Sequence, residues 1–385
     1  MATLFTIDDN ACNLLKAIAH PADPIPGSLQ PLADSIRNWD ALFQLACRHG
    51  VLPLLHHRLS LDGISIPPSI APQWQAAITR NTIQSISNTA ELLRILALFQ
   101  KHNIQAIPFK GVVLAAVAYG DPALRPAGDL DILIRFESLL PATALLLNSG
   151  YDLKTPILQD GSPEAENYFE YHFERPSDGI ILELRWRLEL TQPRYTRVLG
   201  LDWAWPRRAT ALLSGASVPD LDPESKLLVL CMHASKHIWS RLIWILDVAF
   251  LLAATPALDW ARVLAEARRQ GLGRPLTLGV LLARHFAGSV IPPQVLAALE
   301  RDTVAVRLAR HIQENLFHSP GSAPPGRIPY NVLLLDAADR RRLIFSLDFL
   351  RPNERDRAFL RLPSWLEPLY LIVRPLRILR DRSAR

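Results

Sequence analysis

The sequence of 385 residues lacks the features that mark a secreted protein. Only three cysteines occur, and their spacing does not pair them, which excludes a disulfide framework and fits a reducing compartment. The first residues carry no positive charge ahead of an apolar stretch, because Asp8 and Asp9 come early. We therefore expect no secretion signal and a cytoplasmic protein.

Long apolar runs and basic-aromatic patterns are also missing. No uninterrupted apolar run reaches ~18 residues, the length of a membrane-spanning helix, because Asp247 breaks the best candidate. The net charge of +5 suits an anionic substrate, but Lys and Arg are not interleaved with aromatic residues in the central part of the chain. We therefore expect no nucleic-acid partner.

The composition that remains is typical of a globular protein with two or three domains. Hydrophobic residues make up 49% of the chain and charged residues 21%. The patterns predict a helical module over residues 1–103, a mixed α/β part over 104–215, and a second helical part over 216–385 that ends in a basic tail. They also predict helices over residues 4–18, 39–59 with a break at Gly50, and 71–102, and a strand hairpin over 168–174 and 180–186.

Two carboxylates stand one residue apart on an apolar strand, in Gly128-Asp129-Leu130-Asp131-Ile132. Side chains alternate along a strand, so Asp129 and Asp131 should share a face. Two acids on one face repel each other unless a cation lies between them, and Mg²⁺ is commonly held by one or two carboxylates and substrate phosphates. The alternative is a solvated turn that leads into a buried strand.

The segment before the dyad favours the metal site. Residues 104–109 are typical of a short apolar strand and 112–119 of a helix, with Lys110 and Gly111 at the junction. Backbone N–H groups at a helix start bind phosphate, and glycine lets a ligand approach closely. A phosphate cradle beside a metal dyad indicates a site that handles nucleotides.

At these residues the chain resembles the bacterial nucleotidyltransferase family proteins of the superfamily with a DNA polymerase beta-like palm. The resemblance extends from about residue 85 to the C-terminus. It implies an α+β fold, in which a small mixed sheet forms the nucleotidyltransferase palm between N-terminal and C-terminal helical domains. The matching segments are Lys110-Gly111, Leu124-Arg125-Pro126, Gly128-Asp129-Leu130-Asp131-Ile132-Leu133, Leu182-Glu183-Leu184-Arg185-Trp186, His233-Ala234-Ser235-Lys236-His237 and Leu246-Asp247.

The chain departs from the superfamily pattern at two of these segments. The first motif of the superfamily usually contains Gly-Ser or Gly-Gly with the dyad close behind, whereas Lys110-Gly111 precedes a longer loop. Related chains often carry His beside the tryptophan, where this chain has Arg185. These departures concern the phosphate-binding geometry and the side of the site that takes the acceptor.

Glu183 is the third carboxylate that the resemblance implies. It also stands alone in a β-branched, apolar strand, where a charge requires a partner. If Glu183 faces the dyad, it completes a two-metal site; if it faces away, it pairs with Arg185 or Arg187 and is structural.

Two basic residues near the dyad each have a functional and an ordinary interpretation. Arg125, in the loop before the dyad, is expected to neutralise a triphosphate or to hold Asp129, unless it is a solvated loop residue. Lys110, at the end of an apolar strand, either reaches a phosphate or extends into solvent.

A second set of polar groups interrupts the apolar pattern over residues 222–253. If this segment is one continuous helix, His233, His237 and Asp247 fall on one side, with Lys236 and Arg241 at its edges. The resemblance implies that the region after the palm completes the nucleotide site, so we assign His233, Lys236, His237 and Arg241 to the triphosphate or base. A His-x-x-x-His zinc site lacks a clear third ligand, and a structural network with Asp247 is the other alternative.

The resemblance and the residues together predict an enzyme that transfers a nucleoside monophosphate from an NTP to an acceptor and releases pyrophosphate. Asp129, Asp131 and Glu183 would bind Mg²⁺ or Mn²⁺, and Lys110 and Gly111 would bind the phosphates. The acceptor is a small molecule, a peptide or a protein. The alternatives are a nucleotide-binding regulator or toxin–antitoxin component without turnover, and a scaffold whose basic tail, residues 363–385, docks at a membrane.

Overall fold

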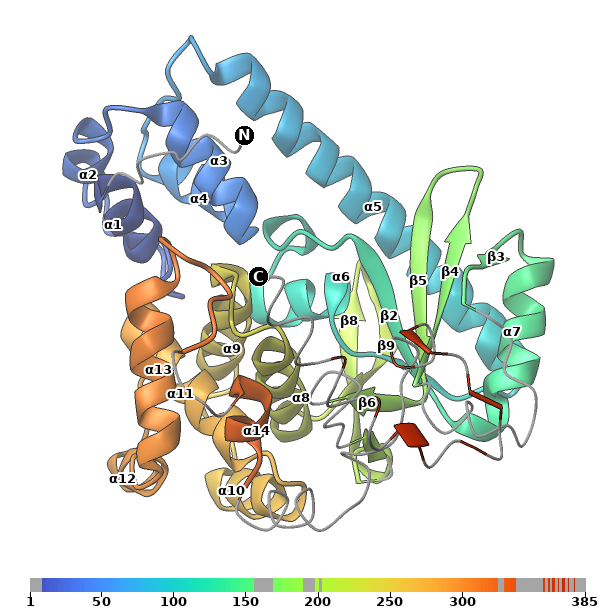
Figure 1. Ribbon diagram of the computed structural model, residues 1–385. Helices are drawn as coiled ribbons and strands as arrows, with labels where there is room; N and C mark the ends of the chain where they lie inside the picture. The colour runs from blue at the N-terminus through green and yellow to red at the C-terminus, as the bar shows by residue number, and fades with distance from the viewer. Residues whose placement is uncertain are drawn as a thin grey trace.

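The computed structural model describes most of the chain as a mixed sheet between two groups of helices (Figure 1). This arrangement confirms the predicted α+β class with a small mixed sheet flanked by helices. The described residues are 9–155, 169–189, 198–200, 203–324 and 329–336, and then Asp356, Phe359, Leu360, Leu362, Pro363, Leu366, Leu369, Tyr370, Val373 and Arg377.

The central sheet has five strands in the order β1-β2-β5-β4-β3. Only β2 and β5 run parallel, and the other neighbours are antiparallel. The predicted hairpin is confirmed as β4 and β5. The bounds are β1 Ala106–Pro108, β2 Asp129–Ile134, β3 Asp152–Leu153, β4 Glu170–Arg175 and β5 Ile180–Arg185.

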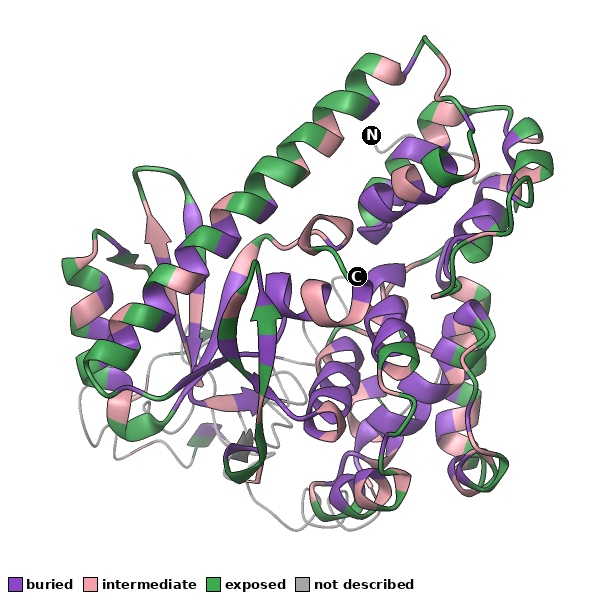
Figure 2. Ribbon diagram, turned by 180° about the vertical axis from the view of Figure 1, so that it is seen from behind, coloured by how far each residue is buried: buried purple, intermediate pink, exposed green. Residues whose placement is uncertain are grey.

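The two faces of this sheet differ in chemistry because polar and apolar residues alternate along its strands. One face carries Leu130, Ile132, Phe173 and Leu182, which pack into one hydrophobic cluster with residues of α5 (Ala71–Lys101) and α7 (Leu139–Asn148). Figure 2, which shows the molecule from behind, has α5 running across the sheet. The opposite face carries the acids of β2 and β5 together with Glu170 and His172 of β4, and it holds the candidate site.

Two small hairpins follow the sheet. Strands β6 (Arg187–Glu189) and β7 (Val198–Gly200) pair with each other, as do β8 (Arg208–Leu213) and β9 (Ala216–Leu221). The β8–β9 hairpin spans the predicted boundary at residue 215, because its second strand begins at Ala216.

The N-terminal helices match the predicted pattern. The break predicted at Gly50 is confirmed, since this residue adopts a left-handed conformation (φ +70°) and caps α3. The long helix predicted over 71–102 is also confirmed as α5. The bounds are α1 Asp9–Ala17, α2 Gln30–Asp34, α3 Trp39–His49 and α4 Leu52–Leu61, and residues 4–8 of the first predicted helix lie outside the described residues.

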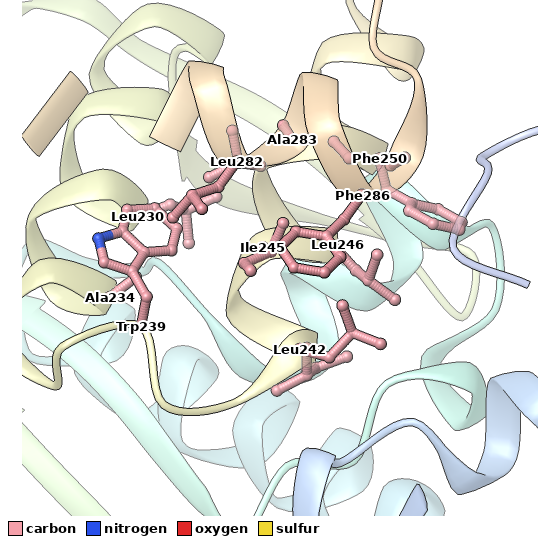
Figure 3. Packing of buried hydrophobic residues seen from close by; sticks show 14 of the residues in the cluster. Leu230, Ala234, Trp239, Leu242, Ile245, Leu246, Phe250, Leu282, Ala283 and Phe286 are labelled. Carbon is pink, nitrogen blue, oxygen red and sulfur yellow. The ribbon is translucent and has the colours of Figure 1, made fainter. Parts of the chain in front are cut away.

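The C-terminal helices share one hydrophobic core with α1, α3 and α4. Figure 3 shows the centre of this core, where Leu230 and Trp239 lie against Leu282, and Leu246 lies near Phe286. The bounds are α8 Pro223–Lys236, α9 Leu242–Ala254, α10 Trp260–Arg269, α11 Gly273–Ala287, α12 Pro293–Leu299, α13 Thr303–Asn315 and α14 Tyr330–Leu334.

The continuous helix considered for residues 222–253 is wrong. The segment forms two helices, α8 and α9, joined by a tight turn in which Ile238 and Trp239 have φ of +53° and +50°. Left-handed backbone is costly for a β-branched residue such as Ile238. The burial of Trp239 beside Gly279 of α11 offsets this cost, because a glycine leaves room for the indole ring.

The basic tail is described at single positions only. Arg377 is buried and pairs with Asp356 (2.7 Å), so it is not a solvated arginine. Arg374, Arg380, Arg382 and Arg385 lie outside the described residues. Among the described helices, none combines the length and apolarity needed to cross a membrane.

Candidate active site

Three carboxylates meet on the face of the sheet opposite α5 and α7. Asp129 and Asp131 project from β2, and Glu183 projects from the neighbouring parallel strand β5, with Asp131 directly opposite Glu183 in the register. Each offers one oxygen, and these oxygens lie within 4.8 Å of one another. Among the described residues, this is the only group of three or more such ligands that could hold a metal ion, and hard oxygen ligands suit Mg²⁺ or Mn²⁺.

Two basic side chains are inserted among these acids. Lys110 Nζ lies 3.0 Å from Asp131 Oδ2, and Arg185 Nε lies 3.3 Å from Asp131 Oδ1. Arg185 also donates to Glu183. Glu183 therefore faces the dyad, and it pairs with Arg185 from that position instead of facing away.

The acids share their negative charge unequally. Burial favours a raised pKa at Asp131, but the positive charges of Lys110 and Arg185 outweigh burial and hold the pKa of this carboxyl below its ordinary value. Burial raises the pKa of Asp129, and the charge of Asp131 raises it further. Burial also raises the pKa of Glu183, which outweighs the opposing effect of Arg185. Without a further cation, the cluster therefore tends to retain protons on Asp129 and Glu183.

Glu170 and His172 on β4 belong to the same cluster, although the sequence analysis did not single them out. His172 lies opposite Glu183 in the register, with Nδ1 3.4 Å from Glu183 Oε1 and Nε2 3.1 Å from Glu170 Oε1. The hydrogen bond to Glu170 and the charge of Glu183 raise the pKa of His172. The alternation of polar residues 170, 172 and 174 with Tyr171 and Phe173 was the signal that could have found them.

Lys110 and Gly111 lie where the first strand turns into a helix, as predicted. Gly111 begins α6 (Gly111–Leu114), which continues into a π-helical turn over Ala115–Tyr119. Its φ of +62° is left-handed, which favours glycine, and an added Cβ would lie 3.6 Å from the backbone oxygen of Asp129. The glycine therefore brings the start of α6 against the strand that carries the dyad.

Arg125 is buried, and the carboxylate that it pairs with is Asp247, not the predicted Asp129. Its Nε and Nη2 donate to the two oxygens of Asp247 on α9 at 2.6 and 2.8 Å. Tyr119 Oη donates to the same carboxylate (2.9 Å). Burial lowers the pKa of Arg125, but Asp247 outweighs this effect, so the guanidinium stays charged. The pair fixes the loop before Asp129 to the helical region.

A small cleft opens between the sheet and α8. It is lined by Phe109, Arg185, Leu188, Val229, Met232, His233, Lys236 and His237. Three of the four helical residues predicted for the nucleotide therefore lie at the cleft together with Arg185. The fourth, Arg241, is not part of the described lining, and its Nε donates to the backbone oxygen of Arg48 (3.1 Å).

The two histidines of the cleft form an aromatic group with Trp244. The rings of His237 and Trp244 stack with centroids 5.0 Å apart, and His233 meets both rings edge-on. Burial lowers the pKa of His237 to about 4, helped by Lys236, and burial also lowers the pKa of His233. Both imidazoles are therefore neutral at pH 7, and the positive charge of the cleft comes from Lys236 and Arg185.

The sequence matches a known family over this whole region. Residues 35–288 match the family described as "Uncharacterised nucleotidyltransferase", and the chain belongs to this family. The matched range contains every acid, base and cleft residue described above. No curated protein matches the chain.

Two solved structures are similar to parts of the chain. One is the solution structure of the antibiotic-resistance factor ANT(2'')-Ia, with 14% identity and a TM-score of 0.31 over 59% of this chain and 98% of that protein. The other is the crystal structure of an antigenic nucleotidyltransferase-like protein from Paracoccidioides brasiliensis, with 17% identity and a TM-score of 0.27 over 51% of this chain and 91% of that protein.

Proposed function

We propose that the protein transfers a nucleoside monophosphate from an NTP to an acceptor hydroxyl or similar group and releases pyrophosphate. The observation that carries the proposal is the convergence of Asp129, Asp131 and Glu183 beside a cleft that contains Lys236 and Arg185. Membership of a nucleotidyltransferase family supports the reaction class. The acceptor in this proposal is a small molecule, a peptide or a protein side chain.

The donor set fits a divalent cation. All three ligands are carboxylates, and burial raises the pKa of two of them, as expected for acids that lack sufficient positive charge. Asp129, Asp131 and Glu183 would hold Mg²⁺ or Mn²⁺. When bound, the ion would neutralise phosphate charge and lower the pKa of the acceptor hydroxyl.

The side chains around the acids have distinct tasks in this reaction. Glu183, with its raised pKa, is the carboxylate suited to take the proton of the acceptor hydroxyl as its oxygen attacks the α-phosphorus. Lys110, the amide of Gly111 and Lys236 would hold the phosphates while the bond to pyrophosphate breaks. The neutral rings of His233 and His237 would contact the base or the sugar.

Arg125 is assigned a positioning task instead of a contact with phosphate. Its two hydrogen bonds to Asp247 anchor the loop that leads to Asp129, and its burial leaves no face for a ligand. We assign Arg241 to the junction with the N-terminal helices, where it reaches the backbone of Arg48. We also propose the cytoplasm as the place of the reaction, since none of the three cysteines forms a disulfide among the described residues.

The test is metal-dependent turnover by the full-length chain. The protein is incubated with each labelled ribonucleoside triphosphate, Mg²⁺ or Mn²⁺ and a cell extract, and pyrophosphate release and labelled product are measured. We expect Asp131→Asn and Glu183→Gln to reduce labelling by ~100-fold or more, as removal of a group that stabilises the transition state does. Asp152→Asn, an exposed acid on β3, is the matched control and should retain labelling. Labelling that persists in Asp131→Asn would contradict the proposal.

A nucleotide-binding regulator without turnover is the second candidate. The observation in its favour is that Lys110 and Arg185 already contact both oxygens of Asp131. This candidate predicts nucleotide binding with a normal affinity but no pyrophosphate release under any metal or acceptor condition.

A further inference from the structure

Arg185 makes contacts that reach beyond a single salt bridge. Its guanidinium contacts Asp131 on β2, Glu183 on its own strand, and Glu170 on β4. The side chain is only 11% exposed. One cation therefore connects two of the three candidate metal ligands with a fourth acid that is not among the three.

The contacts of Arg185 use the oxygens that a metal ion needs. Asp131 Oδ1 faces Arg185 and Asp131 Oδ2 faces Lys110. Glu183 Oε2 accepts from Arg185, and Glu183 Oε1 faces His172. Mg²⁺ requires oxygen ligands at ~2.0–2.1 Å, and a guanidinium on the same oxygens repels it.

We propose that Arg185 is an internal counter-ion of the acid cluster, and that a divalent cation binds Asp131 and Glu183 only when this guanidinium leaves them. The inference rests on the proposed function, because it takes these acids as the metal ligands. Arg185 thus sets the metal affinity of the site, and it is a positioning residue for the reaction.

The structure offers Arg185 a second set of partners. Its contact with Glu170 involves no metal ligand, so it persists when the other two are lost. Arg185 also lines the cleft beside Lys236 and His237, where the phosphates of an NTP would supply negative charge. The nucleotide therefore favours the displaced guanidinium, and the metal and the nucleotide bind cooperatively.

Binding of Mn²⁺ alone to the full-length protein tests this role without any turnover. Free Mn²⁺ is measured by electron paramagnetic resonance for the unaltered chain, Arg185→Gln and Arg187→Gln. We expect Arg185→Gln to bind Mn²⁺ ~10-fold more tightly than the unaltered chain, within the range typical of coupling between sites. Arg187, at the start of β6, carries the same charge and lies outside the contacts described above, so its variant should bind as the unaltered chain does.

Two further variants separate the inference from the proposed function. Asp131→Asn should abolish Mn²⁺ binding in both the unaltered and the Arg185→Gln backgrounds. If binding depends on Asp131 but Arg185→Gln binds no more tightly, the counter-ion inference is wrong and the metal site stands. If no variant binds Mn²⁺, or binding survives Asp131→Asn, the metal site itself is wrong.

Thermal unfolding provides a second measurement, and its transition also shows whether the Arg185→Gln variant is folded. Without metal, Arg185→Gln should melt at a lower temperature than the unaltered chain, because three acids lose the positive charge of Arg185. Added Mg²⁺ should raise its melting temperature more than that of the unaltered chain. Arg185→Lys, whose single ammonium group cannot contact three carboxylates, should give intermediate values in both measurements. Equal metal-induced shifts in all three proteins would overturn the inference.

Discussion

Breaking the buried pair between Arg125 and Asp247 should destabilise the protein far more than removing both partners together. The side chains are 8% and 2% exposed, and two hydrogen bonds of 2.6 and 2.8 Å join them. Asp247→Leu removes the carboxylate partner of a buried guanidinium and leaves it the backbone oxygen of Pro126, and Arg125→Met leaves a buried carboxylate with the hydroxyl of Tyr119. Each single change should lower the free energy of unfolding by ~3–5 kcal/mol.

The double variant removes both charges and should cost much less than the sum of the two single changes. Apolar residues of similar volume often replace a buried ion pair at little cost, so we expect a coupling energy of ~3 kcal/mol or more. Urea denaturation followed by circular dichroism gives the free energy of unfolding for the four proteins. The pair of Arg284 and Glu300, about half exposed at 3.5 Å, is the control, and its cycle should give ~0–1 kcal/mol. Additive costs at the buried pair would refute the reasoning.

Three further predictions concern burial and backbone conformation. Burial lowers the pKa of His49 to about 4 from 6.5, so the unfolded chain binds more protons at this residue between these pH values. His49 should therefore contribute ~3 kcal/mol to the loss of unfolding free energy on acidification across this window, and urea titrations of His49→Phe should show a loss that is smaller by this amount. Gly279→Ala places a Cβ 2.3 Å from a buried sulfur of α8 and should lower the free energy of unfolding by ~1–3 kcal/mol. In the same helix, the Cβ of Gly273→Ala meets nothing within 4 Å, and this variant should not lose that stability. Gly111→Ala places a side chain on left-handed backbone, so it should lower the free energy of unfolding by ~1–2 kcal/mol. It should also weaken nucleotide binding in calorimetry. Gly128→Ala, whose Cβ meets nothing within 4 Å, should lower the free energy of unfolding less.

Local patterns predicted the parts of the fold that depend on local physics. The proline-led helix α5 and the break at Gly50 follow from backbone preferences of single residues. The shared face of Asp129 and Asp131 follows from alternation along β2, because its apolar partners pack under α5 and α7. In each case the signal lies within a few residues of the feature that it predicts.

The features that the sequence did not reveal depend on contacts between distant segments. No proline or glycine marks the turn between α8 and α9, since the cost of φ > 0 at Ile238 is offset by packing of Trp239 against α11. Arg125 lies in a loop, and its partner Asp247 lies 122 residues away on helix α9. Although the predicted continuous helix is wrong, His233 and His237 still meet Trp244, because the two helices fold against each other.

The balance of charges in the acid cluster determines the pKa values of its carboxyl groups. Four carboxylates, those of Asp129, Asp131, Glu170 and Glu183, face the permanent positive charges of Lys110 and Arg185. Because the acids outnumber these cations in a largely buried place, raised pKa values at Asp129 and Glu183 are the expected response. In the proposed function, a divalent cation would take the place of such protons, so its binding would release protons from these two acids.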